Sequence, residues 1–330
     1  MNIARLLDDA AAELEGTLRT TPLPAPPLGT HERFAADFVL AGAGVIRSGR
    51  AADLAAFAEK TGLGVLNAFT AKGLFRWDSP FHLGTGCLQE RDLALAGAGP
   101  ESAVLVVGVD VAECGPRLLA AAGVDASLST WRQVDPADLA AAADRVRASW
   151  GGPPEPPPQP ELFKVLWDVA QPLYKLEAAP LNPARAASDV ASALGADGVV
   201  CAEPGPAGWW IGRTVPTTRL GSVAIPASAR PGAAVARALL TAQRGNPALA
   251  VVDAPLSAPA AALIEYGRER GISFVVEVWG DGGDIADAAG HRARAEAALA
   301  SDGVTVLEVP IDYAATETLI AAAGPLVAWS

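Results

Sequence analysis

Hydrophobic and polar positions alternate along the chain in a way that predicts a repeating strand–helix order. Short apolar runs lead into turns, and longer segments follow in which apolar positions recur at helical spacing. The pattern occupies residues 36–112 and resumes over residues 181–323. Because strands that alternate with helices form parallel sheets, we expect an α/β protein with two doubly wound parallel-sheet domains.

The predicted elements follow from this periodicity, and most of them end at a glycine, a proline or an aspartate. An amphipathic helix is also predicted within residues 2–18, ahead of the first strand. The predicted strands are 38–44, 64–69, 103–110, 198–204, 248–255, 272–278 and 304–310, and residues 70–86 are predicted as a loop. The predicted helices are 49–62, 88–98, 182–194, 231–243, 258–270, 285–300 and 314–323.

Two proline-rich segments interrupt the alternation and suggest the domain boundaries. They read TTPLPAPPLG (20–29) and GGPPEPPPQP (151–160), and such segments are typically extended connectors. We therefore expect four parts. They are a helix and strap (1–30), a central domain (31–150), a linker (151–180) and a second domain (181–330).

Composition narrows the possible partners. Hydrophobic residues make up 51% of the 330 residues and charged ones 19%, which is enough apolar material for packed cores. The net charge of −12 disfavours nucleic acid as a partner. The three cysteines form no CxxC pair, and no segment has the length of a signal peptide or a membrane span. A cytoplasmic protein without membrane contact is expected.

The motifs of common enzyme classes are missing, and the remaining candidates have structural alternatives. No HExxH, GxSxG or GxxxxGK[ST] occurs. Gly42 and Gly44 follow the first strand as in a dinucleotide site, but Arg47 takes the third glycine position, and a tight turn alone requires such glycines. Lys72 and His82 suit an anion site or an ordinary solvated loop.

Residues 36–112 resemble the central domain of thiamine-diphosphate enzymes of the acetolactate synthase type. The shared features are the glycine turn, a helix ending in AEKTG, a KG…P…HLG loop and a final VVG strand. The resemblance implies the nucleotide-binding fold of deoxyhypusine synthase and the sirtuins. In some family members this domain binds FAD or ADP, so FAD, NAD or ADP is a candidate ligand near Gly42 and Gly44.

The second domain resembles the family's diphosphate-binding domain from PLNPARAASDV onward. Glu203 and Gly205 stand where the family has an acid and a glycine after the first strand. The family's metal motif is GDG, then about 24 to 27 residues, then two asparagines. The segment WGDGGD stands in the place of the asparagines. The 24 residues before it are 255–278, and Val252-Asp253-Ala254, which precedes them, stands in the place of GDG.

The resemblance thus implies a degenerate magnesium site. Asp253 keeps the acid, whereas Trp279 and Gly280 replace the asparagines, so one metal-binding amide is lost. Asp281 or Asp284 could supply a substitute oxygen ligand, although an Asp-Gly-rich segment is usually only a turn. The family's glycine–methionine–glycine turn is also replaced, by LGSVAIPASARPG (220–232). Thiamine diphosphate and magnesium are therefore candidate cofactors whose site is eroded.

Only about thirty residues precede the central domain, too few for the family's pyrimidine-binding domain and its catalytic glutamate. We expect no catalytic residue in the chain, and it remains open whether it is an enzyme. One interpretation is a truncated relative that acts as a binding or interaction protein. The alternative is a subunit of a split 2-oxo acid decarboxylase or carboligase. The expected partner is a second copy of the chain or a separate pyrimidine-domain subunit.

Overall fold

The computed structural model describes residues 3–148, 150 and 153–329. The chain divides into two compact units, each with its own sheet. The central unit contains residues 16–167 and 320–328, and the second unit contains residues 3–15, 168–319 and Trp329. Every strand pair in the sheets of the described residues is parallel, which confirms the predicted fold class.

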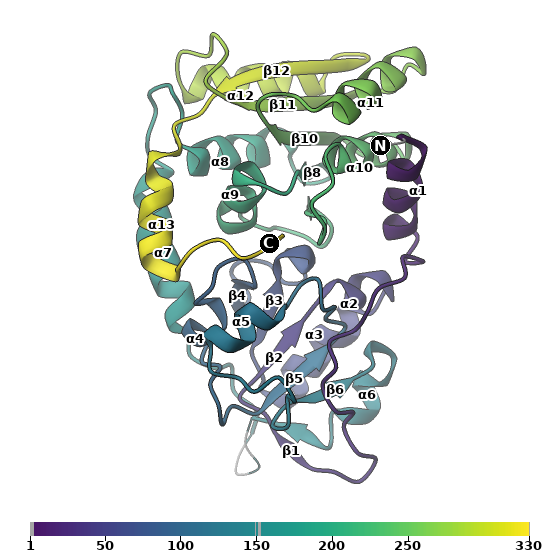
Figure 1. Cartoon of the computed structure of the whole chain (residues 1–330), viewed down its shortest axis with the longest axis vertical. Helices are drawn as coiled ribbons and strands as arrows, with labels where there is room; N and C mark the ends of the chain where they lie inside the picture. The colour runs from purple at the N-terminus through teal and green to yellow at the C-terminus, as the bar shows by residue number, and fades with distance from the viewer. Residues whose placement is uncertain (1–2, 149, 151–152, 330) are drawn as a thin grey trace. The chain divides into compact units, whose positions relative to one another are not determined.

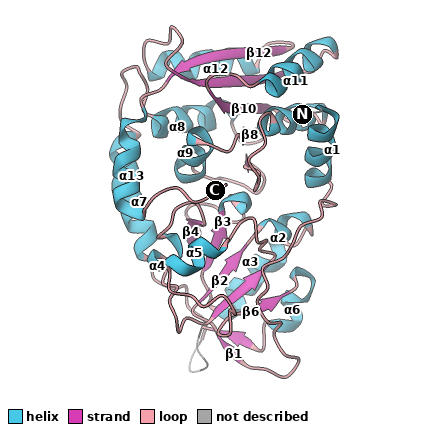
Figure 2. Cartoon of the chain, viewed as in Figure 1, coloured by secondary structure: helices cyan, strands magenta, loops and turns pink. Residues whose placement is uncertain are grey.

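The central unit is built on a five-stranded sheet with the order β4-β3-β2-β5-β6 (Figures 1 and 2). The middle strands are fully buried, as expected of parallel strands that are covered on both faces. The strands are β2 (Phe38–Ala41), β3 (Val65–Ala68), β4 (His82–Gly86), β5 (Val104–Val107) and β6 (Arg132–Val134), and a separate pair joins β1 (Phe34–Ala35) to β7 (Val146–Arg147).

Short helices pack against this sheet. Helix α3 (Ala51–Thr61) buries Leu54 and Phe57 in the core and ends where Gly62 adopts a left-handed conformation, with φ 75°. Helix α6 (Leu139–Ala142) packs against α3. The remaining helices are α2 (Ala43–Arg47), η1 (Phe69–Ala71), α4 (Asp92–Leu95), α5 (Pro116–Ala121) and η2 (Pro136–Asp138).

The second unit has a five-stranded sheet with the order β12-β11-β10-β8-β9. Its strands are β8 (Val199–Ala202), β9 (Val223–Ala224), β10 (Ala248–Asp253), β11 (Phe274–Gly280) and β12 (Val304–Pro310). Its helices are α8 (Pro183–Leu194), α9 (Pro206–Thr214), α10 (Ala233–Gln243), α11 (Ala258–Glu269), α12 (Ala288–Leu299) and η3 (Tyr313–Ala315). Helices α10 and α11 pack together, and α8 packs against α9 and α12.

The N-terminal helix α1 (Ile3–Leu14) belongs to the second unit, not to a separate N-terminal part. It packs on α10 and α11, with Leu6 and Ala10 buried in their core. Its acidic side chains pair with arginines of the same unit: Asp9 with Arg230, Glu13 with Arg237, and Glu15 with Arg244.

The structure differs from the sequence prediction in several places. The loop prediction for 70–86 is wrong over β4, whose residues pair with β3, and only α4 is helical within the predicted helix 88–98. In the predicted linker, 153–160 has no helix or strand, whereas α7 (Glu161–Leu173) is a helix, and residues 151–152 lie outside the described part. Helix α13 (Thr316–Ala323) spans the boundary between the two units. Residues 320–328 group with the central unit, where Gln89 donates a hydrogen bond to the Gly324 carbonyl (2.6 Å). None of the described helices is long and apolar enough to cross a membrane.

Candidate functional site

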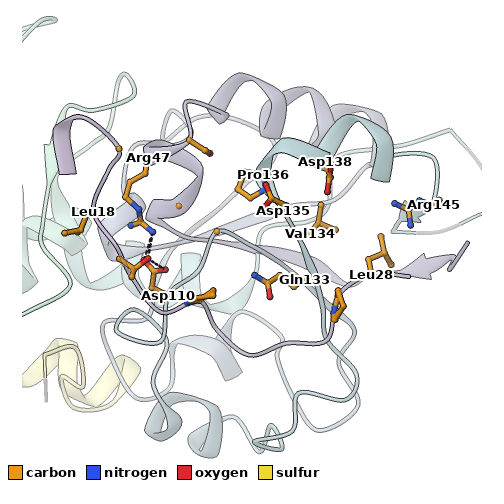
Figure 3. A pocket seen from close by; sticks show the side chains of 17 residues that line it. Leu18, Leu28, Arg47, Asp110, Gln133, Val134, Asp135, Pro136, Asp138 and Arg145 are labelled. Atoms are coloured by element: carbon orange, nitrogen blue, oxygen red, sulfur yellow. Dashed lines mark hydrogen bonds and ion pairs between the residues drawn. The ribbon is translucent and has the colours of Figure 1, made fainter. Parts of the chain in front are cut away.

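A pocket of about 620 Å³ lies at the carboxyl ends of strands β2, β5 and β6 of the central unit (Figure 3). Parallel sheets bind ligands at this edge. The proline-rich strap, residues 20–28, crosses the same edge and is fixed to it by backbone hydrogen bonds: Leu23 N–H donates to Val109, and Leu28 N–H donates to Gln133. The strap therefore forms one wall of the pocket, with Pro22, Pro27 and Leu28 among its lining residues.

Two kinds of polar side chain line this pocket. Arg47 is engaged, because it donates to Asp110 (2.7 Å) and to Thr20 of the strap (3.0 Å), and Thr20 also donates to Asp110. In contrast, Gln133 is half-buried, and none of the described residues hydrogen-bonds to its carboxamide. Gln133 is thus a donor and acceptor that remains available to a ligand.

Gly42 and Gly44 lie at the end of β2, where the chain turns into α2. A Cβ atom at Gly42 would lie 2.5 Å from Glu113 Oε2, and one at Gly44 would lie 2.7 Å from Gly108 Cα. Both positions need glycine because two turns of the chain approach each other closely. Gly44 also lines the pocket, whereas Gly42 is buried beneath it.

In the second unit, Glu203, Gly205 and Asp253 come together at the carboxyl ends of β8 and β10. Asp253 accepts hydrogen bonds from Ala207 N–H at the start of α9 (3.1 and 3.3 Å) and from the Tyr313 hydroxyl (3.0 Å). Glu203 Oε1 accepts from Gly232 N–H (2.5 Å). The two carboxylates thus occupy backbone N–H groups that an anionic ligand would need.

Burial governs the titration of these acids. It raises the pKa of Glu203 to about 7, against the hydrogen bond from Gly232 N–H and with a further contribution from the charge of Asp253. Burial also raises the pKa of Asp253, while the hydrogen bonds from Tyr313 and Ala207 lower it. Both shifts come from a loss of solvation, and no described cation compensates them.

Trp279 and Gly280 stand beside Asp253 in the sheet, since Asp253 pairs with Trp279 in register. The indole of Trp279 is buried, however, and its Nε1–H donates to Glu277 (2.9 Å). Asp281 is exposed, and Asp284 pairs with Arg294. None of these side chains joins Asp253.

These residues do not fit a magnesium–diphosphate group as they lie. Magnesium requires near-octahedral oxygen ligands. Asp253 Oδ1 already accepts from two donors, and within the described residues no three His, Cys, Asp or Glu side chains form a potential metal cluster. A diphosphate would also meet the Asp253 carboxylate at the start of α9 and the Glu203 carboxylate at the start of α10.

Lys72 and His82 are both buried, so the solvated-loop interpretation does not apply. Burial, with a smaller contribution from the charge of Lys72, lowers the pKa of His82 to about 4. His82 is therefore neutral at physiological pH and carries no charge for an anion.

Sequence reasoning missed Tyr313, Glu113 and Gln133. Tyr313 is 60 residues from Asp253 in the chain, and Glu113 is 70 residues from Ala43, so no spacing pattern links them. The proline-rich strap was the one sequence signal that pointed toward Gln133. Backbone polar groups of a segment that crosses a sheet edge need hydrogen-bond partners, and residues at the end of a strand provide them.

Comparison with solved structures shows which fold the chain has. A thiamin diphosphate-dependent enzyme from Mycobacterium smegmatis superposes with a TM-score of 0.61 at 17% identity, covering 94% of this chain and 64% of that chain. Benzoylformate decarboxylase from Polynucleobacter necessarius superposes with a TM-score of 0.58 at 16% identity, with the same coverage. The chain therefore has the fold of these enzymes and spans about 64% of their length.

The family match is more specific. Residues 36–124 match the model for the thiamine pyrophosphate enzyme central domain, which confirms the resemblance found in the sequence. No curated protein matches the sequence. The matched family is described by thiamine pyrophosphate, and the edge containing Asp253 does not fit that group.

Proposed function

We propose that this protein is a small-ligand-binding relative of the thiamine-diphosphate enzymes that does not perform thiamine catalysis by itself. Its ligand site is the pocket of the central unit, and its ligand is nucleotide-like. The observation that carries the proposal is the pocket itself: about 620 Å³ at the carboxyl edge of a parallel sheet, with apolar walls and the unengaged carboxamide of Gln133.

The second unit supports the proposal that the protein does not perform thiamine catalysis by itself. The Asp253 carboxylate is already hydrogen-bonded to Ala207 N–H and to Tyr313, and Trp279 is buried where a metal-binding amide would be needed. Binding of magnesium and diphosphate would have to break these hydrogen bonds without a second protein ligand to compensate.

Calorimetric titration tests both parts. We expect the purified protein to bind adenosine, with Gln133→Leu weakening binding at least about tenfold, because a lost hydrogen-bonded pair costs roughly 1.4 kcal/mol or more. Gln243→Leu, which changes an exposed glutamine in the second unit, is the matched control and should leave binding unchanged. Absence of binding of adenosine, ADP and NAD alike would refute the pocket assignment.

The same protein should show no binding of thiamine diphosphate in the presence of Mg²⁺. The titration is repeated with Asp253→Ala. Micromolar binding by the wild type that is lost in Asp253→Ala would show that the edge opens for the cofactor, and would contradict the proposal.

The second candidate function is a diphosphate-domain subunit of a split 2-oxo acid decarboxylase or carboligase. It is favoured by Asp253, which keeps an acid at the end of β10 beside Glu203. In this case the carboxylate that activates the cofactor would come from another polypeptide. Decarboxylation of 2-oxo acids only after a pyrimidine-domain chain is added would support it.

A further inference from the structure

The glycine turn beneath the central pocket has no N–H group left for a phosphate. Dinucleotide sites hold their diphosphate on the N–H groups of such a strand-to-helix turn. Here Gly42 N–H donates to Val107 (3.0 Å), and Gly44 N–H donates to Gly108 (2.8 Å). The N–H of Ala43 between them donates to Glu113 Oε1 (2.9 Å).

Glu113 occupies the position that a phosphate would take. Its Oε1 accepts from Ala43 N–H and from the Thr70 hydroxyl, and its Oε2 accepts from Asp110 N–H (2.7 Å). The side chain is 2% exposed, so no ligand reaches these donors without displacing it. Two carboxylate oxygens on backbone and hydroxyl donors reproduce the hydrogen bonding of a bound anion.

Burial raises the pKa of Glu113 to about 7, while its hydrogen bonds to Thr70, Ala43 and Asp110 lower it. The carboxyl group remains hydrogen-bonded in either protonation state, so a change of pH within the physiological range does not vacate the turn.

The charges of the pocket also disfavour a polyanion. Two arginines, Arg47 and Arg145, face three aspartates, Asp110, Asp135 and Asp138. Arg47 is held by Asp110 (2.7 Å), and Arg145 donates to the Gly29 carbonyl. The charge of Arg47 is therefore offset by a carboxylate, whereas Arg145 keeps its charge and further N–H donors.

The groups that remain suit a nucleoside. Gln133 presents both a donor and an acceptor, the pairing that reads the N6 and N7 edge of adenine. Asp135 and Asp138 are exposed at the rim beyond the end of β6, where an acid accepts ribose hydroxyls in related sheet folds (Figure 3). Apolar side chains complete the walls: Leu18, Pro22, Pro27, Leu28, Val134 and Pro136.

We propose that the central pocket selects a nucleoside and discriminates against ligands with a diphosphate, and that Glu113 is the residue that sets this specificity. The inference rests on the proposed function of the pocket and names its ligand class. In this arrangement the diphosphate of ADP or NAD finds no free N–H group on the glycine turn at residues 42–44. Binding would remove its hydration without replacing it, which lowers the affinity.

Calorimetric titration of the full chain with adenosine, ADP and NAD tests the inference. We expect adenosine to bind at least as tightly as ADP and NAD. If ADP or NAD binds more tightly than adenosine, the inference is overturned while the proposed function stands. If none of the three binds, the proposed function fails, and the inference fails with it.

Two variants test the role of Glu113. Glu113→Ala removes the carboxylate and exposes Ala43 N–H and Asp110 N–H, so the affinity for ADP relative to adenosine should rise about tenfold or more. Glu113→Gln keeps the shape and still fills the turn, so this ratio should stay near the wild-type value. Equal ratios in folded Glu113→Ala and wild type would overturn the role of Glu113. If Glu113→Ala does not fold, the inference is judged from the affinity for ADP relative to adenosine in the wild type and in Glu113→Gln. A rise in ADP affinity in Glu113→Gln would then count against the inference.

Discussion

At the residue scale, the Asp253 side chain caps the N-terminus of helix α9. Its carboxylate accepts from Ala207 N–H in the first turn of α9, and Gly205, with φ 145°, leaves room for it, since a Cβ there would lie 2.5 Å from Asp253 Oδ2. An acid at a helix N-terminus satisfies an otherwise unpaired donor and interacts favourably with the helix dipole.

Asp253→Ala should therefore lower the free energy of unfolding by about 1–2 kcal/mol, as measured by urea denaturation. Tyr313→Phe, which removes one of the donors to the same carboxylate, should cost about 1 kcal/mol. A stability gain in Asp253→Ala would show instead that the carboxylate is held under strain, as in a vacated ligand site.

At the scale of elements, a buried charge network fastens α8 and α12 to β11. His291 of α12 lies 3.0 Å from Glu277 of β11 and 3.4 Å from Asp189 of α8. Burial alone would lower the pKa of His291, but the charge of Glu277 and the hydrogen bonds with both acids outweigh it and raise the pKa to about 9. The protonated histidine therefore joins three elements through charge-assisted hydrogen bonds.

Because the folded-state pKa of His291 lies above its usual 6.5, its contribution to stability is complete below that value and is lost as pH rises through about 9. We expect the free energy of unfolding to fall by about 2 kcal/mol between pH 7.5 and 9.5. Glu113 and Glu203 titrate between 4.5 and about 7, below this window. The hydrogen bond with Cys114 and burial raise the pKa of Cys87, and burial raises the pKa of Cys201, so these thiols add a smaller loss of stability near pH 9. His291→Gln should therefore remove most of the slope, and an unchanged slope in this variant would assign the effect elsewhere.

At the scale of the whole molecule, each unit is assembled from distant parts of the chain. Helix α1 belongs to the second unit although the residues that follow it belong to the central unit. Leu6, 3% exposed, lies in the core of the second unit with residues of α10 and α11. A substitution in α1 should therefore act on the sheet that follows residue 198, not on its neighbours in sequence.

Leu6→Ala should destabilise the second unit by about 2–4 kcal/mol because it leaves a cavity in its core. In hydrogen exchange, we expect reduced protection in β8 and β10 and little change in β2 and β5. Asp8→Ala, at an exposed position of the same helix, should have no effect. Equal loss of protection in both sheets would mean that the two units unfold together.

The sequence by itself determined the elements whose signals are local. The strands β2, β5, β10, β11 and β12 and the helices α3, α8 and α11 follow from apolar periodicity with glycine, asparagine or serine at their ends. The resemblance of residues 36–112 to a thiamine-diphosphate enzyme central domain was also legible in the sequence from its ordered series of motifs, and the family model matches residues 36–124. Strand β4 was missed because proline, glycine and aspartate before it give the signal of a loop.

Only the tertiary structure decided which groups meet at the candidate sites. Glu113 reaches Ala43, Tyr313 reaches Asp253, and the strap reaches Gln133, each across tens of residues. Acids and glycines at strand ends are compatible both with a phosphate site and with a turn closed by a carboxylate. The two differ in which donor lies within hydrogen-bonding distance of which acceptor, and that depends on how the whole sheet is packed.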